Sequence, residues 1–285
     1  MSEMSNLPFG ARLRAAMDTR GPLCVGIDPH AALLGSWGLG DDASGVREFG
    51  LRTVEAAAGR AAIVKPQVSF FERFGSAGFA ALEEVIAAAR DAGLLVIADA
   101  KRGDIGSTMD AYAAAWLTPG SPLEADALTV NPFLGVGALD GAFALADQHD
   151  KGLFVLAATS NPEAEVLQRS ISETGRAVSA DIVSVVSARN TEHTPAGEWG
   201  SFGFVIGATV DWTDAGIAAF APVAPILAPG FGTQGATPSD LHRRFGSMSA
   251  AVIASESRSI LSAGPAGLAA AIDARVAEYR EAGRG

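Results

Sequence analysis

Eight short apolar runs recur along the chain, and most are continuous rather than alternating with polar residues. The runs are Leu23–Ile27, Ala61–Val64, Leu94–Ala98, Ala127–Val130, Leu153–Ala157, Phe204–Ile206, Pro225–Ala228 and Ala250–Ala254. Continuous runs of this kind are typical of parallel strands that are covered on both faces. We therefore predict eight buried parallel strands.

Helical spacing of apolar residues fills the stretches between these runs. Two such sets are Phe79, Leu82, Val85, Ile86 and Ala89, and Leu268, Ile272, Val276 and Tyr279. Strand and helix thus alternate through eight units, which predicts an α/β fold, the (β/α)8 TIM barrel, with its chemistry at the carboxyl ends of the strands. An open doubly wound sheet is the alternative.

The length of 285 residues suits one barrel, so we predict a single domain over residues 1–285. The longest gap between predicted strands separates the fifth from the sixth. Within it, the polar segment Thr191–Ser201 follows a long helical stretch. This composition predicts a longer loop at about residues 190–202.

Charged residues accompany two of the apolar runs. Asp99, Lys101 and Asp104 follow the third run, and Lys65 closes the second. Any one of them taken alone reads as a solvated loop charge or a helix cap. Four such charges at one end of a barrel are costly unless a substrate uses them, so we predict a catalytic cluster.

The spacing within this cluster suggests how it works. Asp99 and Lys101 stand two apart on an extended segment, so their side chains point the same way into the barrel mouth. Asp104 lies beyond Gly103 and either caps the next helix or reaches a neighbouring subunit. Because a nearby carboxylate favours the charged form of a lysine, the cluster predicts a proton donor rather than a Schiff-base nucleophile.

A glycine-rich segment from Gly230 to Gly235 matches the dinucleotide-binding pattern, and Glu256 follows about twenty residues later. A nucleotide-binding sheet needs more strands after this motif than the apolar runs predict. We therefore expect a phosphate-binding loop after the seventh strand, with Arg258 after the eighth as a second phosphate ligand. The alternatives are a glycine turn without a ligand, and a surface arginine that pairs with Glu256 or caps the helix.

Composition restricts the possible functions. The formal net charge of −11 argues against nucleic-acid binding, which needs a basic surface. Cys24 is the only cysteine and the four histidines lack metal-ligand spacing, so we predict neither disulfide nor metal. Residues 1–8 lack the basic and apolar segments of a signal peptide, and no apolar run reaches the length of a membrane span. We expect a cytoplasmic protein without a membrane partner.

Seven segments resemble those of the orotidine 5′-phosphate decarboxylase family, in particular its longer bacterial branch. They are Gly26-Ile-Asp-Pro29, Val64-Lys-Pro-Gln67, Asp99-Ala-Lys-Arg-Gly-Asp-Ile-Gly106, Asn131-Pro-Phe-Leu-Gly135, Thr159-Ser-Asn-Pro162, Pro229-Gly-Phe-Gly-Thr-Gln-Gly235 and Arg258-Ser-Ile260. The Asp-x-Lys-x-x-Asp signature together with the last two segments is specific. The resemblance spans nearly the whole chain.

This resemblance implies decarboxylation of orotidine 5′-monophosphate to uridine 5′-monophosphate, the last step of de novo UMP synthesis, in a homodimeric barrel without a cofactor. Lys101 would protonate the pyrimidine carbon that loses carbon dioxide, and Asp99 would face the departing carboxylate. Lys65, Asp28 and the partner subunit's Asp104 would hold the ribose hydroxyls.

The resemblance also assigns the rest of the substrate. Ser160 would contact the pyrimidine edge, and Asn131 would belong to the substrate-binding set. Gln234 would bridge base and phosphate, and Arg258 with the backbone of Gly232–Gly235 would grip the phosphate. Ser257 stands where many members of the family carry glycine.

Two rival functions stay open. A magnesium-dependent sugar-phosphate aldolase or keto-acid decarboxylase on a related barrel would hold its metal on Asp99 or a nearby carboxylate. Lys65 and Lys101 argue against it, because they neutralise the aspartates that the metal would need. A non-catalytic phosphate-binding barrel would keep the glycine loop and would predict binding alone.

Overall fold

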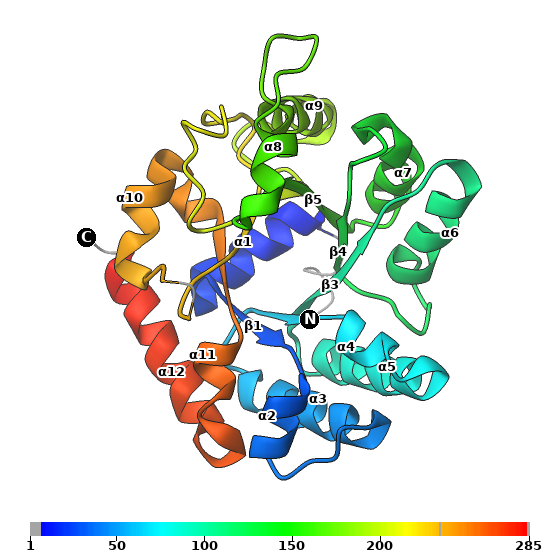
Figure 1. Ribbon diagram of the computed structural model, residues 1–285, viewed down its shortest axis with the longest axis vertical. Helices are drawn as coiled ribbons and strands as arrows, with labels where there is room; N and C mark the ends of the chain where they lie inside the picture. Colours follow the sequence, from blue (N-terminus) through cyan, green and yellow to red (C-terminus); the bar gives the residue numbers. More distant parts are fainter. Residues whose placement is uncertain (1–6, 234, 284–285) are drawn as a thin grey trace.

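The computed structural model describes residues 7–233 and 235–283, which form eight parallel strands closed into a barrel (Figure 1). The strands are β1 (Leu23–Ile27), β2 (Ile63–Pro66), β3 (Leu95–Arg102), β4 (Ala127–Val130), β5 (Gly152–Ala158), β6 (Phe202–Ile206), β7 (Ile226–Pro229) and β8 (Val252–Glu256). Each strand pairs with the next along the chain, and β8 pairs with β1. The predicted (β/α)8 barrel is confirmed, and the open sheet is excluded.

Helices surround the barrel on all sides (Figure 1). They are α1 (Phe9–Arg20), α2 (Ala31–Ser36), α3 (Ala43–Ala57), α4 (Ser69–Glu72), α5 (Gly75–Asp91), α6 (Gly106–Leu117), α7 (Asp140–Gln148), α8 (Glu165–Gln168), α9 (Val178–His193), α10 (Leu241–Phe245), α11 (Arg258–Leu261) and α12 (Gly264–Ala282). Short 3-10 helices also lie between these elements: η2 (Val136–Leu139), η3 (Pro162–Ala164), η4 (Pro238–Asp240) and η5 (Gly246–Ala251). The two predicted apolar helix faces are those of α5 and α12, and both pack on the core, with Phe79 only half-buried.

The strands bury their side chains in two separate cores because successive residues point to opposite faces of the sheet. One core lies between the barrel and the surrounding helices, and the other fills the barrel interior. In β1, for example, Cys24 belongs to the interior and its neighbour Val25 to the outer layer. Burial raises the pKa of the Cys24 thiol to about 12, consistent with a small hydrophobic role.

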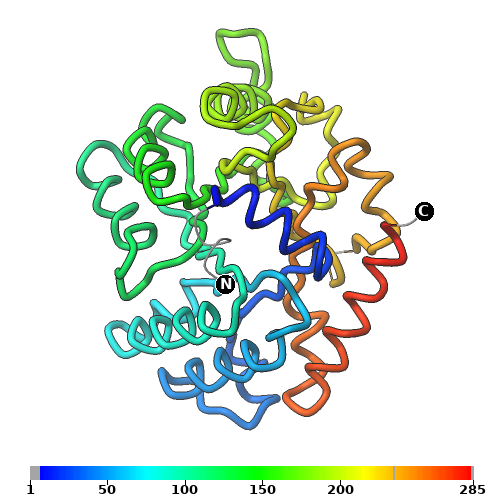
Figure 2. Tube along the Cα trace, turned by 180° about the vertical axis from the view of Figure 1, so that it is seen from behind, coloured from blue at the N-terminus to red at the C-terminus, as the bar shows by residue number. Residues whose placement is uncertain are grey.

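Helix α1 closes the amino-terminal end of the barrel, where it crosses the opening (Figure 2). Phe9, Leu13 and Met17 of α1 join the interior core, and the Phe9 ring meets Phe154 of β5 edge to face with centroids 6.0 Å apart. These three apolar residues stand four positions apart, which is the same helical spacing as in Leu268, Ile272 and Val276, so the sequence held a signal for this helix that the predicted elements did not include. Because α1 covers this end, the carboxyl ends of the strands form the uncovered end of the barrel.

The connection before β6 is shorter than predicted. Helix α9 extends to His193 and β6 begins at Phe202, so only residues 194–201 of the loop predicted at about residues 190–202 are irregular. Two hydrogen bonds join the last turns of α9 to the start of β6 and so shorten the connection. Asn190 Nδ2 donates to the Phe202 carbonyl at 2.7 Å, and Asn190 Oδ1 accepts the Phe202 N–H at 3.1 Å. Across residues 7–233 and 235–283, no helix has both the length and the apolar character to span a membrane.

Candidate active site

The charged residues of the third apolar run belong to the strand rather than following it. Strand β3 continues to Arg102, four residues beyond the predicted end, and Arg102 pairs with Val130 of β4 after a shift in register. At this irregularity Lys101 adopts a φ of 49°, which is uncommon for a residue with a side chain. The expectation of a strand end at Ala98 was wrong because these charges pair with one another and can remain in the sheet.

The Asp99 carboxylate lies between two ammonium groups. Lys65 Nζ on β2 donates to Asp99 Oδ2 at 2.7 Å, and Lys101 Nζ donates to Asp99 Oδ1 at 2.5 Å. The side chains of Asp99 and Lys65 are each 8% exposed, whereas that of Lys101 is 44% exposed. The structure therefore brings three of the predicted catalytic residues together, and Lys101 is the member that faces the open mouth.

Mutual attraction keeps the two buried members of this cluster charged. Burial alone would raise the pKa of Asp99, but the nearby Lys65 and Lys101 outweigh it and hold that pKa well below its usual range. Burial alone would lower the pKa of Lys65, but the charges of Asp99 and Asp28 outweigh it and raise that pKa. Both groups are therefore ionised throughout the neutral range.

The Asp99→Asn substitution should lower the free energy of unfolding by about 3 kcal/mol, because removing one partner of a buried pair leaves an uncompensated charge. Since the pKa of Asp99 is depressed in the folded protein, its contribution is complete above the unfolded carboxyl pKa of about 3.9. It is lost only as the pH falls from there through the folded value. Urea denaturation of both proteins should therefore give a constant difference between about pH 5 and pH 9 that shrinks in acid.

Glu84→Gln is the control for this measurement, because Glu84 pairs with Arg47 on the surface, where an ion pair contributes little. Its stability should match that of the parent chain at every pH. A variant at Asp99 as stable as the parent would contradict a stabilising role for the cluster.

Thr129 is a member of the site that the sequence analysis missed. Its hydroxyl donates to Asp99 Oδ1 at 3.0 Å and accepts the Lys101 backbone N–H at 2.9 Å. Thr129 is fully buried on β4, one strand away from the residues it orients. The available signal was a single hydroxyl in the otherwise apolar run Ala127–Val130.

Asp28 and Asp104 occupy different positions relative to the cluster. Asp28 follows β1, and its Oδ1 is buried with no hydrogen-bond partner among the described residues. Asp104 is half-buried after β3, and its Oδ1 accepts the N–H of the exposed Ile105 at 2.8 Å. Within the part of the chain that the structure describes, no hydrogen bond joins Asp104 to Lys65 or Lys101.

Two further predicted substrate ligands lie on the loops after β4 and β5. Asn131 is exposed, and its Oδ1 accepts the Phe133 N–H at 3.0 Å, which folds the loop into a tight turn. Ser160 is exposed and helps to line a cavity of about 280 Å³ with Gln168 and Arg169. Both residues leave side-chain atoms available to a ligand at the mouth.

The glycine segment lies in the connection from β7 to η4, and Gly230, Gly232 and Gly235 have φ angles of 119°, 75° and 99°. The N–H of Gly232 donates to the Ala236 carbonyl at 2.8 Å, and that of Gly235 to the Gly232 carbonyl at 3.1 Å. These two amides are thus engaged within the loop, which differs from the expected backbone grip on a phosphate. Gln234 lies outside the described residues.

Arg258 begins α11 and is exposed, and its guanidinium makes no hydrogen bond or ion pair with a described residue. Glu256, the alternative partner, is buried and pairs with Arg275 at 3.1 Å instead. The interpretation of Arg258 as a surface arginine paired with Glu256 is therefore wrong.

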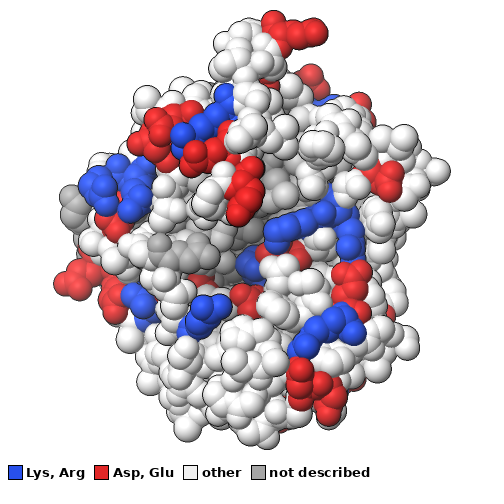
Figure 3. All heavy atoms as spheres, in the orientation of Figure 1, with Lys and Arg blue, Asp and Glu red and all other residues white. Residues whose placement is uncertain are grey.

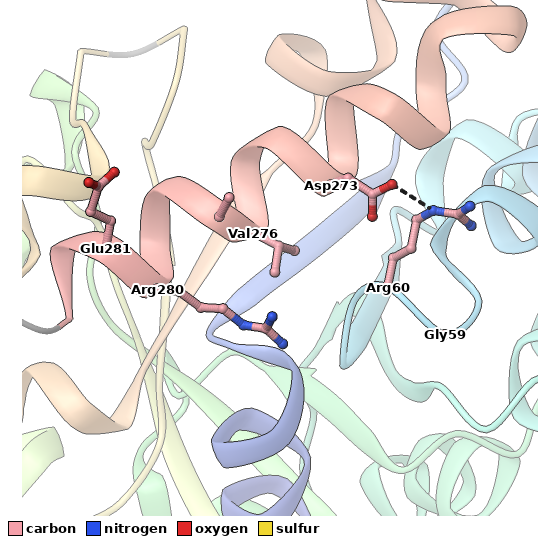
Figure 4. Close-up of a pocket in the computed structure, with 7 residues that line it drawn as sticks. Gly59, Arg60, Asp273, Val276, Arg280 and Glu281 are labelled. Atoms are coloured by element: carbon pink, nitrogen blue, oxygen red, sulfur yellow. Dashed lines mark hydrogen bonds and ion pairs between the residues drawn. The ribbon is translucent and has the colours of Figure 1, made fainter.

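On the face of Figure 1, the space-filling view shows a hollow near the centre with basic and acidic side chains beside it (Figure 3). Elsewhere, a cavity of about 430 Å³ lies between α12 and the turn at Gly59, where Arg60 Nε pairs with Asp273 Oδ2 at 3.2 Å (Figure 4). That cavity contains none of the clustered lysines and aspartates.

Among residues 7–233 and 235–283, no three His, Cys, Asp or Glu side chains are placed to hold a metal ion.

The chain is similar to proteins of one family along nearly its whole length. The model of the Orotidine 5′-phosphate decarboxylase / HUMPS family matches residues 21–272. A protein of Streptomyces coelicolor named orotidine 5′-phosphate decarboxylase is 53% identical over 261 residues, covering 90% of this chain and 91% of the relative. A protein of the same name from Corynebacterium efficiens is 50% identical over 273 residues, covering 95% and 96%.

Solved structures show the same similarity. A crystal structure of a Streptomyces avermitilis protein superposes with a TM-score of 0.93 at 49% identity, covering 100% of this chain and 99% of the other. The structure of Leishmania donovani OMP decarboxylase gives a TM-score of 0.77 at 30% identity, covering 98% and 100%.

Proposed function

The chain belongs to the orotidine 5′-phosphate decarboxylase / HUMPS family, and we infer that it decarboxylates orotidine 5′-monophosphate (OMP) to uridine 5′-monophosphate (UMP) and carbon dioxide. Relatives that share about half of its sequence over at least 90% of its length carry the name of this activity. The observation that carries the mechanism is the Asp99 carboxylate held between Lys65 and Lys101 at the open end of the barrel.

Lys101 is the proton donor in this proposal. Loss of carbon dioxide breaks a carbon–carbon bond and leaves an electron pair on a ring carbon, which an ammonium group in a preorganised site stabilises. The proton then passes from Lys101 Nζ to that carbon, and the neutral amine regains a proton from solvent. The Lys101 side chain is the more exposed of the two lysines that bind Asp99, which supports this role.

Asp99 opposes the substrate carboxylate. Two carboxylates at short range repel, and the repulsion falls as one of them leaves as neutral carbon dioxide, so the transition state is favoured over the bound substrate. Lys65 keeps Asp99 ionised, and Thr129 fixes its orientation. Neither residue needs a cofactor to act in this way.

The remaining groups bind the ends of the substrate. The unpartnered Oδ1 of Asp28 is an acceptor for a ribose hydroxyl, and Ser160 and Asn131 lie on loops at the mouth. Arg258, with no partner among the described residues, is the phosphate ligand. We also assign Gln234 to the base and phosphate, on the resemblance alone.

A homodimer completes the site in this proposal. Three large apolar side chains next to Asp104 and Asn131 are exposed in the single chain: Ile105 at 63%, Phe133 at 71% and Leu134 at 53%. A cluster of this kind is typical of a surface that another protein covers. Covering it with a second copy would place the Asp104 of each subunit toward the other's site.

The rival magnesium-dependent chemistry needs carboxylate oxygens that are free to bind the metal. Here both oxygens of Asp99 already accept from lysines. Incubation of the purified protein with OMP in excess EDTA should convert the substrate completely, with loss of its absorbance and release of carbon dioxide. Folded protein that leaves OMP unchanged would disprove the function, and activity abolished by EDTA and restored by magnesium would favour the rival.

A further inference from the structure

Glu256 at the end of β8 is a buried carboxylate that the proposed reaction does not use. Its side chain is fully buried, and its two oxygens bind three groups from helices outside the barrel. Tyr279 OH of α12 donates to Oε1 at 2.7 Å, while Ser259 Oγ of α11 and Arg275 Nε of α12 lie 2.6 and 3.1 Å from Oε2. The carboxylate thus joins β8 to both α11 and α12 (Figure 1).

The glycine segment rests directly on this carboxylate. A Cβ atom at Gly232 would lie 2.5 Å from Ser259 Oγ and 2.9 Å from Glu256 Oε2, so only a residue without a side chain fits. The preceding residue, Phe231, is buried, and its ring meets that of Tyr279 edge to face with centroids 5.8 Å apart. Two consecutive residues of the glycine segment therefore contact partners of Glu256.

The same carboxylate also holds the helix that carries Arg258. Ser259 is the next residue after Arg258, and its hydroxyl is bound to Glu256 in the first turn of α11. A negative charge this close to a phosphate site would repel the ligand unless it were neutralised. Arg275 supplies the neutralising charge, and the two hydroxyls occupy further lone pairs.

We propose that Glu256 is a positioning residue for phosphate binding, which fixes the backbone at Phe231 and Gly232 and the helix bearing Arg258 as one unit. This inference rests on the proposed function, because it takes the ligand there to be the OMP phosphate. Glu256 itself touches no part of the substrate. It acts through Gly232 and Ser259.

The test compares OMP with orotidine, the same nucleoside without its phosphate. In Glu256→Gln, an amide group replaces one acceptor and faces donors, so the KM for OMP should rise at least about tenfold. The kcat/KM for orotidine, measured at high enzyme concentration, should stay within about twofold, because orotidine has no phosphate and the contacts that Glu256 makes, with Ser259 and beside Gly232, are proposed to serve the phosphate. A merely structural role would lower both activities together, and that result would overturn the inference.

Glu124→Gln is the matched control. Glu124 is a comparably buried carboxylate at the amino end of the barrel, where Lys151 Nζ and Arg90 Nη1 bind it at 2.8 and 2.9 Å. This variant should melt at a lower temperature than the parent and leave the ratio of OMP to orotidine activity unchanged. A changed ratio would show that loss of any buried carboxylate disturbs phosphate binding, and would overturn the specific role of Glu256.

Arg258→Ala distinguishes failure of the proposed phosphate site from failure of the positioning role of Glu256. If it leaves the KM for OMP unchanged, the phosphate assignment in the proposed function is wrong. If it raises that KM and Glu256→Gln does not, only the positioning role is wrong. Should Glu256→Gln not fold, Ser259→Ala removes a single contact and should raise the KM for OMP about threefold while orotidine activity is retained. An unchanged KM in that variant would overturn the inference.

Discussion

Lys101→Ala should lower kcat for OMP by at least about 10⁴-fold, because it removes both a proton donor and a charge that faces the carbanion. Binding of UMP, measured by calorimetry, should stay within a few fold, since the phosphate and ribose ligands lie on other elements. The non-catalytic alternative predicts binding without turnover of OMP, in the parent and in the variant alike. Loss of UMP binding in parallel with turnover would show that Lys101 acts in binding rather than in proton transfer.

Lys151→Ala is the control for that experiment. The chain contains three lysines, and Lys151 is the one that lies outside the cluster, paired with Glu124 at the other end of the barrel. Its loss should reduce thermal stability and leave kcat unchanged. A large fall in kcat would mean that damage to the barrel, rather than missing proton donation, explains the effect at Lys101.

Asp104→Ala should be nearly inactive as a pure protein, yet should regain activity when it is co-refolded with the equally inactive Lys101→Ala chain. In a two-fold dimer that shares Asp104 across the interface, each mixed dimer holds one intact site, so a random mixture should reach about a quarter of parental activity. Turnover measured against the mixing ratio tests this. No recovery at any ratio would place Asp104 in the site of its own subunit.

A second mixture of variants is the control for this complementation experiment. Asp99 and Lys101 lie on the same strand and bind each other directly, so both serve one site. Co-refolding Asp99→Asn with Lys101→Ala should therefore recover nothing, because every mixed dimer has one defect in each site. Recovery in this mixture would indicate exchange of whole strands rather than of Asp104.

The apolar runs predict the barrel because each of its strands is buried on both faces, and burial on both faces requires a continuous apolar run in the sequence. Strands β1 and β4 begin and end as predicted, whereas β3 runs on through its charged residues. That extension depends on ion pairs with Lys65, thirty-four positions away in the sequence, which no local rule contains. Helix α1 has the same four-residue apolar spacing as α12, but the place of its apolar residues inside the barrel depends on the closed sheet and is visible only in the structure.

Some residues of the candidate site can likewise be predicted from the sequence, and others cannot. Asp99, Lys65 and Lys101 can be grouped from sequence because parallel strands bring their carboxyl ends to one rim. Thr129 cannot be grouped with them from sequence, because buried threonines are common in strands and only the structure shows that this one binds Asp99. Asp104 is half-buried and makes no hydrogen bond with Lys65 or Lys101 among the described residues, so its proposed role depends on the proposed homodimer.

The scarcity of lysine has a consequence for handling the protein. Lys65 and Lys101 lie within β2 and β3, and Lys151 immediately precedes β5. The bond after Lys65 leads to proline, and the other two bonds lie in or next to paired strands. A lysine-specific protease therefore cannot cut by way of a mobile surface loop, and its rate of cleavage measures how often the barrel itself opens.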